Sequence, residues 1–376
     1  MSLELRVVER IGQIPAEEWN ALVREDASPF VEHAWLDCLE ESQSVGGRSG
    51  WLPRHLVLYD GKEVVAAAPA YLKTNSEGEF VFDWSWADLA HRMGLDYYPK
   101  LVLAVPFTPA MGHRVLWRPD RDRTETIAIF AKAIRTLTKE LGLSSAHVLF
   151  PDETEANIWG DIGGFSVRNG VQYHWQNRGF KTFEDFLATL PQKKRTQIRR
   201  ERKQPAMDGM TLETLGPDDL TSDVAATMHE LYLTTVDKYF YGRRYMKKRM
   251  FELVRTRFAQ RLAWVVAKKD GRIVASAFNV KKDKVLYGRY WGTFIDRPFL
   301  HFNVCYYHGI DQAIREGLQT FNPGAGGEHK RVRGFEPTMT LSAHHLEDKR
   351  FGAIIRAHLE REREAIREYI ESGGDE

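Results

Sequence analysis

Residues 324–337, GAGGEHKRVRGFEP, bring together side chains that could transfer a proton and side chains that could bind an anion. Glu328 and His329 are candidate proton acceptors near neutral pH, His329 by its intrinsic pKa and Glu328 if burial raises the pKa of its carboxyl. Lys330 and Arg333 could bind a phosphate or a carboxylate of a substrate. The pattern therefore favours a general base beside an anion-binding group.

The glycines of this segment, Gly324, Gly326 and Gly327, would allow several backbone N–H groups to converge on an anion. Their spacing matches neither the P-loop, which needs G-x-x-x-x-G-K-[ST], nor the dinucleotide fingerprint G-x-G-x-x-G. The alternative is a tight turn that binds no ligand.

A second candidate lies in YGRYWG, residues 287–292, which reads as a strand. Alternation places Arg289 and Trp291 on one face and Tyr290, between two glycines, on the other. The glycines would leave space for a ligand, and the Tyr290 hydroxyl could protonate a leaving group. The alternative is a core strand with one paired arginine.

Two aspartates in the first half, Asp83 and Asp88 of DWSWAD, could bind a substrate amine through their carboxylates. A pair of capping residues in a loop explains these aspartates equally well.

A metal site is not predicted, although the second half contains His301, His308, His329, His344 and His345. None of these histidines forms an H-x-x-x-H pair with a third ligand at a familiar spacing.

The sequence predicts that the elements positioning these residues occur twice, beginning with a hairpin in each half. Residues 54–73 and 261–282 each read as strand, Asp-Gly corner and strand, which is a strong hairpin signal. A third strand rich in aromatic residues is expected after each hairpin, at 79–88 and at 284–294.

A helix and a short strand follow in both halves. Residues 123–143 place apolar side chains at three- and four-residue spacing, as do residues 304–318. Strands are expected at 146–151 and 318–324. The chain therefore predicts two similar α/β modules with mixed sheets, at 1–175 and 176–376, of which the second includes a C-terminal amphipathic helix.

The strongest charge run lies between the repeats, at residues 193–203. On a helix these side chains would surround the axis, so a solvated helix is one reading and an anion- or nucleic-acid-binding surface is the other. The candidate contacts are Lys193, Lys194, Arg195, Arg199 and Arg200.

Composition narrows the class of protein. A formal net charge of +1 excludes bulk attraction to nucleic acid or membrane, so any basic site must be local. Cys38 and Cys305 lie far apart and read as buried thiols in a reducing compartment. No basic segment followed by an apolar run opens the sequence, and no apolar stretch approaches the roughly 20 residues of a spanning helix. We therefore expect a cytoplasmic protein without a signal peptide or transmembrane segment.

Several long motifs, in order, resemble the FemAB-like family of peptidoglycan biosynthesis or recognition proteins, which is similar to tandem GNAT-fold acyltransferases. The resemblance runs from about residue 28 to the terminal helix. The motifs are SPFVEHAWLDCLEES, GWLPRHL, YYPKLVLAVPFTPAMGHRVL, VLYGRYWG, LHFNVCYYHGIDQAI and GAGGEHKRVRGFEP.

The resemblance implies transfer of an acyl or aminoacyl group to an amine. Fem-type enzymes use aminoacyl-tRNA and a cell-wall precursor, and other tandem members use acyl thioesters. The R/Q-x-x-G-x-G/A loop that many acetyltransferases use for coenzyme A is missing here, which weakens the acyl-coenzyme A reading. The family also has glutamate where this chain has Asn303 and glutamine where it has Gly326.

We therefore expect a tandem GNAT-like N-acyltransferase with no tightly bound cofactor, using acyl-CoA or aminoacyl-tRNA as co-substrate. Its acceptor would be an amine-bearing small molecule or a cell-wall precursor. Glu328 or His329 would act as base and Tyr290 as proton donor. The expected substrate contacts are Arg289, Lys330, Arg333, Asp83, Asp88, Asn303 and Trp291. The alternatives are a non-catalytic module that recognises cell-wall fragments and an RNA-binding protein that uses residues 193–203.

Overall fold

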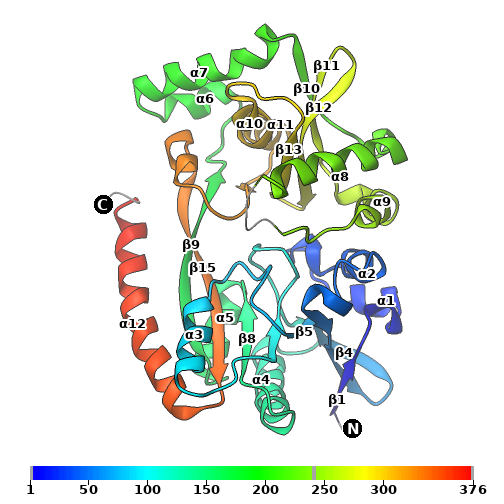
Figure 1. Ribbon diagram of the computed structural model, residues 1–376, viewed down its shortest axis with the longest axis vertical. Coiled ribbons are helices and arrows are strands. Elements are labelled where there is room, and N and C mark those ends of the chain that lie inside the picture. Colours follow the sequence, from blue (N-terminus) through cyan, green and yellow to red (C-terminus); the bar gives the residue numbers. More distant parts are fainter. Residues whose placement is uncertain (1–2, 239–242, 374–376) are drawn as a thin grey trace. The chain divides into compact units, whose positions relative to one another are not determined.

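The computed structural model describes residues 3–238 and 243–373 and, within them, every side chain except that of Glu328. The chain forms two compact units, whose elements are labelled in Figure 1. Unit 1 comprises Met1–Val171 and Met339–Glu376, and unit 2 comprises Gln172–Thr338. Both units combine helices with β-sheet, so the predicted α/β class is confirmed.

Unit 1 contains two sheets. Its strands are β1 (Leu3–Val8), β2 (Trp51–Pro53), β3 (His55–Asp60), β4 (Glu63–Ala68), β5 (Ala70–Lys73), β6 (Lys100–Leu103), β7 (Leu116–Trp117), β8 (Ser145–Leu149) and parts of β9 (Ser166–Gln176) and β15 (Glu336–Leu346). The first sheet is antiparallel, in the order β1-β3-β4-β7. The second includes the run β2-β5-β6-β8-β15, in which only the β6–β8 pair is parallel.

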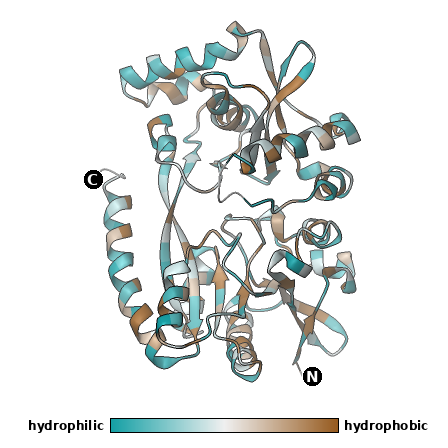
Figure 2. Cartoon of the chain, in the orientation of Figure 1, coloured by the Kyte–Doolittle hydropathy of each residue, from teal (hydrophilic) through white to brown (hydrophobic). Residues whose placement is uncertain are grey.

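Helices pack on these strands with their apolar faces inward. The helices of unit 1 are α1 (Ala16–Asn20), α2 (His33–Glu41), α3 (Trp84–Arg92), α4 (Arg123–Glu140), α5 (Glu153–Asp161) and α12 (Lys349–Glu371). Ile127, Phe130 and Ile134 of α4 share a core with strand residues such as Val148. Figure 2 shows the hydrophobic residues on the strands and a mainly hydrophilic α12.

Local signals predicted most of unit 1, with one error. The hairpin at 54–73 is confirmed as β3 and β4, and the helix at 123–143 is confirmed as α4. The strand expected at 79–88 is wrong, because α3 begins at Trp84. Trp86 and Ala90, four residues apart, are both buried, so the aromatic residues follow a helical period rather than the alternation of a strand.

The predicted division at residue 175 differs from the compact units, which group Met339–Glu376 with unit 1. Strand β15 pairs with β8, and Phe351 and Leu359 of α12 share a core with Trp86 of α3. A repeat along the sequence does not reveal that the last strand and helix return to the first unit.

Unit 2 contains a sheet that includes the order β10-β11-β12-β13-β14-β9. The strands not yet named are β10 (Met210–Thr214), β11 (Val265–Lys269), β12 (Arg272–Lys282), β13 (Val285–Thr293) and β14 (Thr320–Asn322). The helices are α6 (Phe183–Ala188), α7 (Gln192–Met207), α8 (Ser222–Val236), α9 (Lys248–Arg257), α10 (Leu300–Phe302) and α11 (His308–Glu316), with one π-helical turn at Asn303–Tyr307 and a 3₁₀ segment at Glu328–Arg333.

The predicted hairpin and strand of unit 2 are confirmed as β11, β12 and β13. Asp270 and Gly271 at the corner both have positive φ, 49° and 75°, as a tight hairpin turn requires. Strands β13 and β14 pair in parallel only over Val285–Tyr287 and Thr320–Asn322, after which β13 continues to Thr293. The two strands therefore part after Tyr287 and Asn322.

Gly292 allows α8 to pack directly on β13, because a Cβ at this position would lie 1.8 Å from the carbonyl oxygen of Leu231. We expect Gly292→Ala to lower the free energy of unfolding by about 3 kcal/mol, the upper part of the usual range for overpacking. Urea unfolding followed by tryptophan fluorescence measures the change. Gly12→Ala is the control, since the nearest atom to its new Cβ would be 3.7 Å away, and equal stability of both variants would contradict the contact.

Candidate functional site

A cavity of about 700 Å³ opens in unit 2 beside the place where β13 and β14 part. Its lining comes from the end of α8, from β12 and β13, from the loop after β13, from the segment that runs from α10 through the π-helical turn, and from the glycine loop after β14. A single π-helical turn inside a helix is typical of functional sites. Five of the predicted residues line the cavity, namely Arg289, Tyr290, Trp291, His329 and Lys330.

A bulge in β13 turns these side chains to different faces. Asn279 pairs with Gly288 and Phe278 pairs with Tyr290, which leaves Arg289 as the extra residue. The ring of Tyr290 packs edge-on against Tyr232 of α8, at 5.1 Å between centroids. The ring of Trp291 instead lies 4.5 Å from that of His301, at the start of the π-helical segment. The predicted proton donor and Trp291 therefore have different neighbours.

Lys330 is hydrogen-bonded to the backbone of the glycine loop. Its side chain is buried, and Nζ donates hydrogen bonds to the carbonyl oxygens of Gly324, at 2.7 Å, and Ala325, at 3.2 Å. The N–H of Gly324 donates to Asn322 Oδ1 at 2.9 Å. These hydrogen bonds have both partners within the protein. This part of the loop is therefore a turn stabilised by Lys330 and Asn322, and it does not present these groups to a phosphate.

Burial lowers the pKa of Lys330 to about 8, and the positive charge of Arg289 contributes. Burial likewise lowers the pKa of Arg289 to about 10. Both groups remain cationic at neutral pH, so the cavity carries positive charge.

His329 is the one predicted base whose side chain is described, since that of Glu328 lies outside the description. Its Nε2 and the hydroxyl of Tyr306 are 2.9 Å apart, which fixes the orientation of the ring. Burial, together with the charges of Lys330 and Arg333, lowers the pKa of His329 below its ordinary value. The imidazole is therefore neutral at pH 7 and able to accept a proton.

Arg333, which was predicted to bind substrate, is not among the residues that line the cavity. Its Nη2 lies 3.3 Å from Oε2 of Glu201, and its Nε donates to the hydroxyl of Tyr307 at 3.0 Å. Tyr307 in turn donates to Glu201. The guanidinium also lies 3.4 Å from the ring centroid of Phe302 and donates to the carbonyl oxygen of His329 at 2.9 Å. The anion that Arg333 binds is thus Glu201 of the basic helix α7.

Asn303 is also structural in this arrangement rather than a contact of the cavity. Its Nδ2 donates to the backbone carbonyls of Glu201 and Phe299, both at 2.9 Å. The glutamate expected from the family resemblance at this position is thus replaced by an amide that joins α7 to the start of the π-helical segment.

Glu201 was not singled out from the sequence, because it is one acid within a run of basic residues. Its side chain is 1% exposed, and it accepts hydrogen bonds from Tyr307 and from Gln197, the latter at 2.8 Å. The available signal was that an acid surrounded by bases, next to Ile198 on the helix surface, marks the buried face. Asn279, Tyr306 and His301 of the cavity were missed as well.

We expect Glu201→Gln to lower the free energy of unfolding of unit 2 by about 3–5 kcal/mol, because it leaves Arg333 buried without its counter-ion. It should also speed amide hydrogen exchange at 328–333. Glu184→Gln is a matched control on an exposed pair with Arg199, where the expected cost is at most about 1 kcal/mol. If the two variants exchange and unfold alike, the ion pair does not hold the loop.

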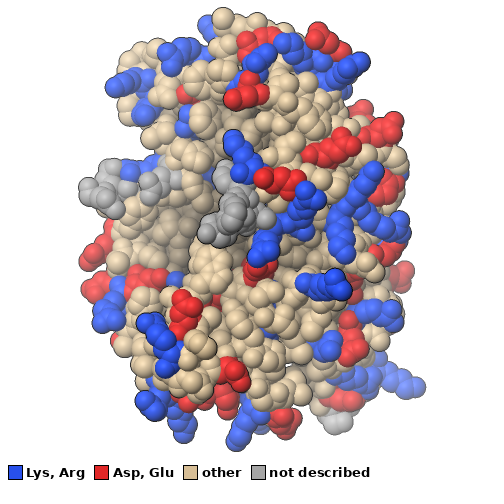
Figure 3. Space-filling view, in the orientation of Figure 1, with Lys and Arg blue, Asp and Glu red and all other residues tan. Residues whose placement is uncertain are grey.

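The basic helix α7 buries only Ile198, Glu201 and Pro205. Figure 3 shows Lys and Arg side chains on the surface where Figure 1 draws this helix. Arg199 is paired with Glu184, and Arg195 donates to the carbonyl of Leu190 at 3.1 Å.

The remaining predicted cations of α7 differ in their surroundings. Lys193 and Lys194 form no ion pair within the part of the chain that the structure describes. Arg200 lies 6.0 Å from the ring centroid of Phe299, a residue that also lines the cavity. The two lysines are therefore available to an anion.

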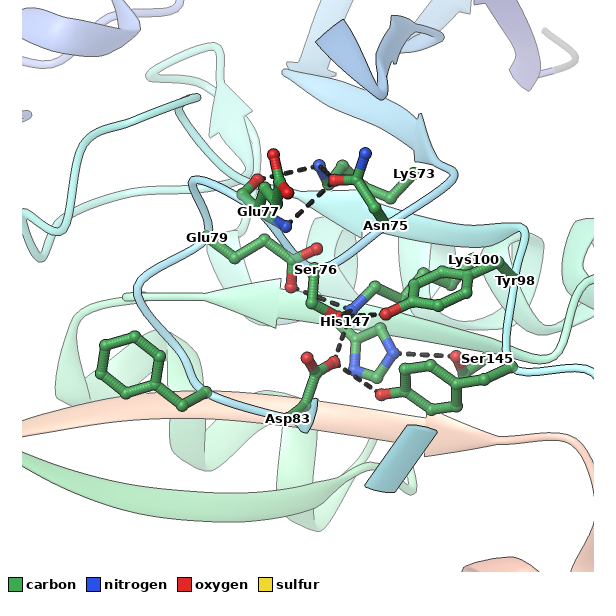
Figure 4. Close-up of polar contacts among 12 residues, drawn as sticks. Lys73, Asn75, Ser76, Glu77, Glu79, Asp83, Tyr98, Lys100, Ser145 and His147 are labelled. Carbon is green, nitrogen blue, oxygen red and sulfur yellow. Dashed lines mark hydrogen bonds and ion pairs between the residues drawn. The ribbon is translucent and has the colours of Figure 1, made fainter. Parts of the chain in front are cut away.

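The predicted amine-binding residue Asp83 lies in unit 1, in a buried polar cluster (Figure 4). The ammonium of Lys100 contacts Asp83 and donates to Glu79 Oε2 at 2.9 Å and Ser76 Oγ at 3.2 Å. Asp83 also accepts from the Tyr97 hydroxyl at 2.6 Å. The amine that Asp83 binds is thus an internal lysine. Asp88 is exposed on α3 and takes no part.

The charges of this cluster balance within the protein. Burial opposes ionisation of Asp83, but the ammonium of Lys100 outweighs burial and lowers the pKa of the carboxyl. Burial raises the pKa of Glu79 to about 7, partly offset by Lys100. Lys100 itself has a raised pKa, because the attraction of the two carboxylates exceeds the effect of burial.

We expect Lys100→Met to lower the free energy of unfolding by about 3–5 kcal/mol, because two buried carboxyls lose their counter-ion. Urea unfolding at pH 7 gives the value. Lys62→Met changes an exposed lysine of the same unit and should stay within about 0.5 kcal/mol of the wild type. A Lys100 variant as stable as the Lys62 variant would show that the ion pairs do not stabilise unit 1.

Other expected features can be placed briefly. Cys38 and Cys305 are free thiols, the first buried and the second partly buried at the cavity. Among the described residues, no group of three or more His, Cys, Asp or Glu side chains is arranged to hold a metal ion. Within the same residues, no helix is long and apolar enough to cross a membrane.

Comparison with known proteins supplies the remaining findings. The model of the FemAB-like family, described as peptidoglycan biosynthesis/recognition, matches residues 10–375. No curated protein sequence matches the chain significantly.

Three solved structures are similar to the chain. The C-terminal domain (DUF2156) of a proposed lysylphosphatidylglycerol synthetase from Agrobacterium fabrum has a TM-score of 0.55 at 13% identity, covering 91% of this chain and 95% of that one. FemX has a TM-score of 0.54 at 11% identity, covering 95% and 100%. A tandem GNAT protein from the clavulanic acid biosynthesis pathway has a TM-score of 0.46 at 12% identity, covering 92% and 98%. The chain shares its fold with the first two of these structures, and the predicted mixed α/β class with a C-terminal helix is confirmed.

Proposed function

We propose, from the premise that the chain belongs to the FemAB-like family, that it is an N-acyltransferase. It would transfer an acyl or aminoacyl group from an activated ester or thioester to an amine. One observation carries the proposal: the cavity beside the parted strands β13 and β14 contains a neutral, oriented imidazole next to buried positive charge.

The reaction follows from these groups. The acceptor nitrogen attacks the carbonyl carbon of the donor, and His329 takes the proton that the nitrogen loses, through the ring nitrogen that is not bonded to Tyr306. Negative charge on the carbonyl oxygen is stabilised by backbone N–H groups of β13 beyond its pairing with β14. Collapse of the tetrahedral intermediate breaks the bond to the leaving oxygen or sulfur, which receives a proton from an acid, for which Tyr290 is the candidate.

The Tyr306 hydroxyl positions His329, and the Glu201–Arg333 pair holds the backbone of the same loop. A base fixed in this way needs little reorganisation when the acceptor binds. Glu328 stays a second candidate for the base.

The donor is proposed to be aminoacyl-tRNA or acyl-CoA, with a cytoplasmic amine or cell-wall precursor as acceptor and no tightly bound cofactor. Exposed Lys193 and Arg200, with the partly exposed Lys194, support a polyanionic donor, and Arg199 lies on the same helix paired with Glu184. The same surface supports the alternative function, a non-catalytic module that binds RNA or cell-wall fragments.

The test begins with a thermal-shift and mass-spectrometric screen against acyl-CoA esters, aminoacyl-tRNA and amines. With the donor found, we expect His329→Ala to lower the single-turnover rate by about 10²–10⁴-fold. His358→Ala, an exposed histidine of α12, should leave the rate unchanged. Wild-type rates for both His329→Ala and Glu328→Gln would refute the catalytic assignment, while salt-sensitive tRNA binding without transfer would favour the RNA-binding alternative.

A further inference from the structure

The polar groups that line the cavity of unit 2 are mostly hydrogen-bond donors. Arg289, Lys330 and Asn279 contribute a guanidinium, an ammonium and an amide N–H₂. Among the side chains that the structure describes, which exclude that of Glu328, the one carboxylate in the lining belongs to Asp296, which is exposed. Acceptor atoms of a ligand would complement these donors, although the lining also holds acceptors such as the neutral imidazole of His329.

The amide group of Asn279 indicates where in the cavity the acceptor atoms of a ligand would bind. Its side chain is 1% exposed, and Nδ2 has no hydrogen-bond partner among the described residues. Gly288, opposite it in the sheet, keeps the space beside this amide open, because a Cβ there would lie 3.5 Å from Asn279 Oδ1 and 3.2 Å from the Cα of Pro323. A buried amide N–H₂ without a partner costs free energy that a bound acceptor would recover.

The two buried lysines Lys100 and Lys330 differ in whether a carboxylate lies next to the ammonium group. Lys100 of unit 1 contacts two carboxylates, and its pKa is raised. Lys330 of unit 2 contacts two backbone carbonyls, and its pKa is lowered. Lys100 therefore has its counter-ions within the protein, whereas Lys330 contacts no carboxylate among the described side chains, which leaves room for the anion of a ligand.

The form of the cavity favours a carboxylate over a phosphate. A carboxylate is planar and singly charged, and it matches an arginine fork and an amide N–H₂. The carbonyl oxygens of Gly324 and Ala325 converge on Lys330 and would repel the second charge of a phosphate. Trp291 and His301 supply aromatic walls next to the charged groups.

We propose that the unit 2 cavity binds the carboxylate of an amino acid or peptide through Asn279, Arg289 and Lys330, so that the acyl acceptor is an amine that also carries a carboxylate. The inference rests on the proposed N-acyl transfer. The carboxylate takes no part in bond making, since the new bond forms at the amine and the product keeps its free carboxylate.

Binding is tested without turnover, by isothermal titration and tryptophan fluorescence at pH 7. The probes are L-alanyl-L-alanine, its C-terminal amide and inorganic phosphate. We expect the dipeptide to bind at least tenfold more tightly than its amide and than phosphate. Equal binding of the amide, or binding of phosphate alone, would overturn the proposal.

Variants locate the site. Asn279→Asp places a negative charge against the ligand and should weaken dipeptide binding at least tenfold, as should Lys330→Met. Lys284→Met, an exposed lysine next to β13, is the control and should bind like the wild type. Circular dichroism confirms folding, and Asn279→Ser, which removes the amide without adding charge, supplies a second reading if one variant does not fold. Wild-type affinity in a folded Asn279→Asp protein would contradict the site.

The pH dependence gives an independent readout. Lys330 loses its proton above about pH 8, so dipeptide affinity should fall as pH rises through and above this value, and the Lys330→Met variant should not show this fall. Among the described residues, the other ionisable groups nearest Lys330 do not change charge between pH 7 and 9. The α-amine of the dipeptide does titrate near pH 8, so the profile of the Lys330→Met variant supplies the baseline. Arg289 keeps its proton, His301 and His329 are already neutral, and burial raises the pKa of Cys305. A wild-type profile that matches the profile of the Lys330→Met variant would count against Lys330 as the carboxylate ligand.

The outcomes separate this inference from the proposed function. Dipeptide binding at the mapped site without acyl transfer would refute the enzyme and leave the carboxylate site standing. Acyl transfer to the dipeptide amide as fast as to the dipeptide would refute the carboxylate site and leave the enzyme standing.

Discussion

The buried carboxylate of Glu201 is the constraint on which the arrangement of unit 2 depends. It neutralises Arg333 and receives the hydroxyl of Tyr307, while the backbone carbonyl of the same residue receives the amide of Asn303. One residue of α7 is thus bonded to the π-helical turn and to the loop that carries His329. Because a buried charge cannot remain unpaired at low cost, these segments must meet in this one way. The ion pair between Glu201 and Arg333 therefore sets the orientation of the loop that carries His329.

Much of this fold could be predicted from local patterns. Asp-Gly corners between apolar runs identified both hairpins, because the turn geometry is fixed by two residues. The apolar period of α4 identified that helix for the same local reason. The error at α3 arose because aromatic residues spaced for a helix were read as an alternating strand, and the return of β15 to unit 1 depends on partners far away in the chain.

The candidate site was partly predictable as well. Residue type identified His329, Lys330 and Arg289 as charged groups near the cavity, but it did not reveal which of the cations would find a partner inside the protein. Arg333 and Asp83 looked equally available in the sequence, and both are bound to buried residues of opposite charge. Pairing of this kind is decided by residues more than a hundred positions away for Arg333, and by loop geometry for Asp83.

The path of the chain has a consequence for its synthesis. Unit 2 is one continuous segment, Gln172–Thr338, whereas unit 1 is made of two segments that lie before and after it. A ribosome therefore finishes every residue of unit 2 while unit 1 still lacks part of β15 and all of α12. Domains that are complete in sequence can fold during translation. Unit 2 can thus fold before unit 1 is complete. Until β15 has been synthesised, β8 of unit 1 lacks its pairing partner on that side of the sheet.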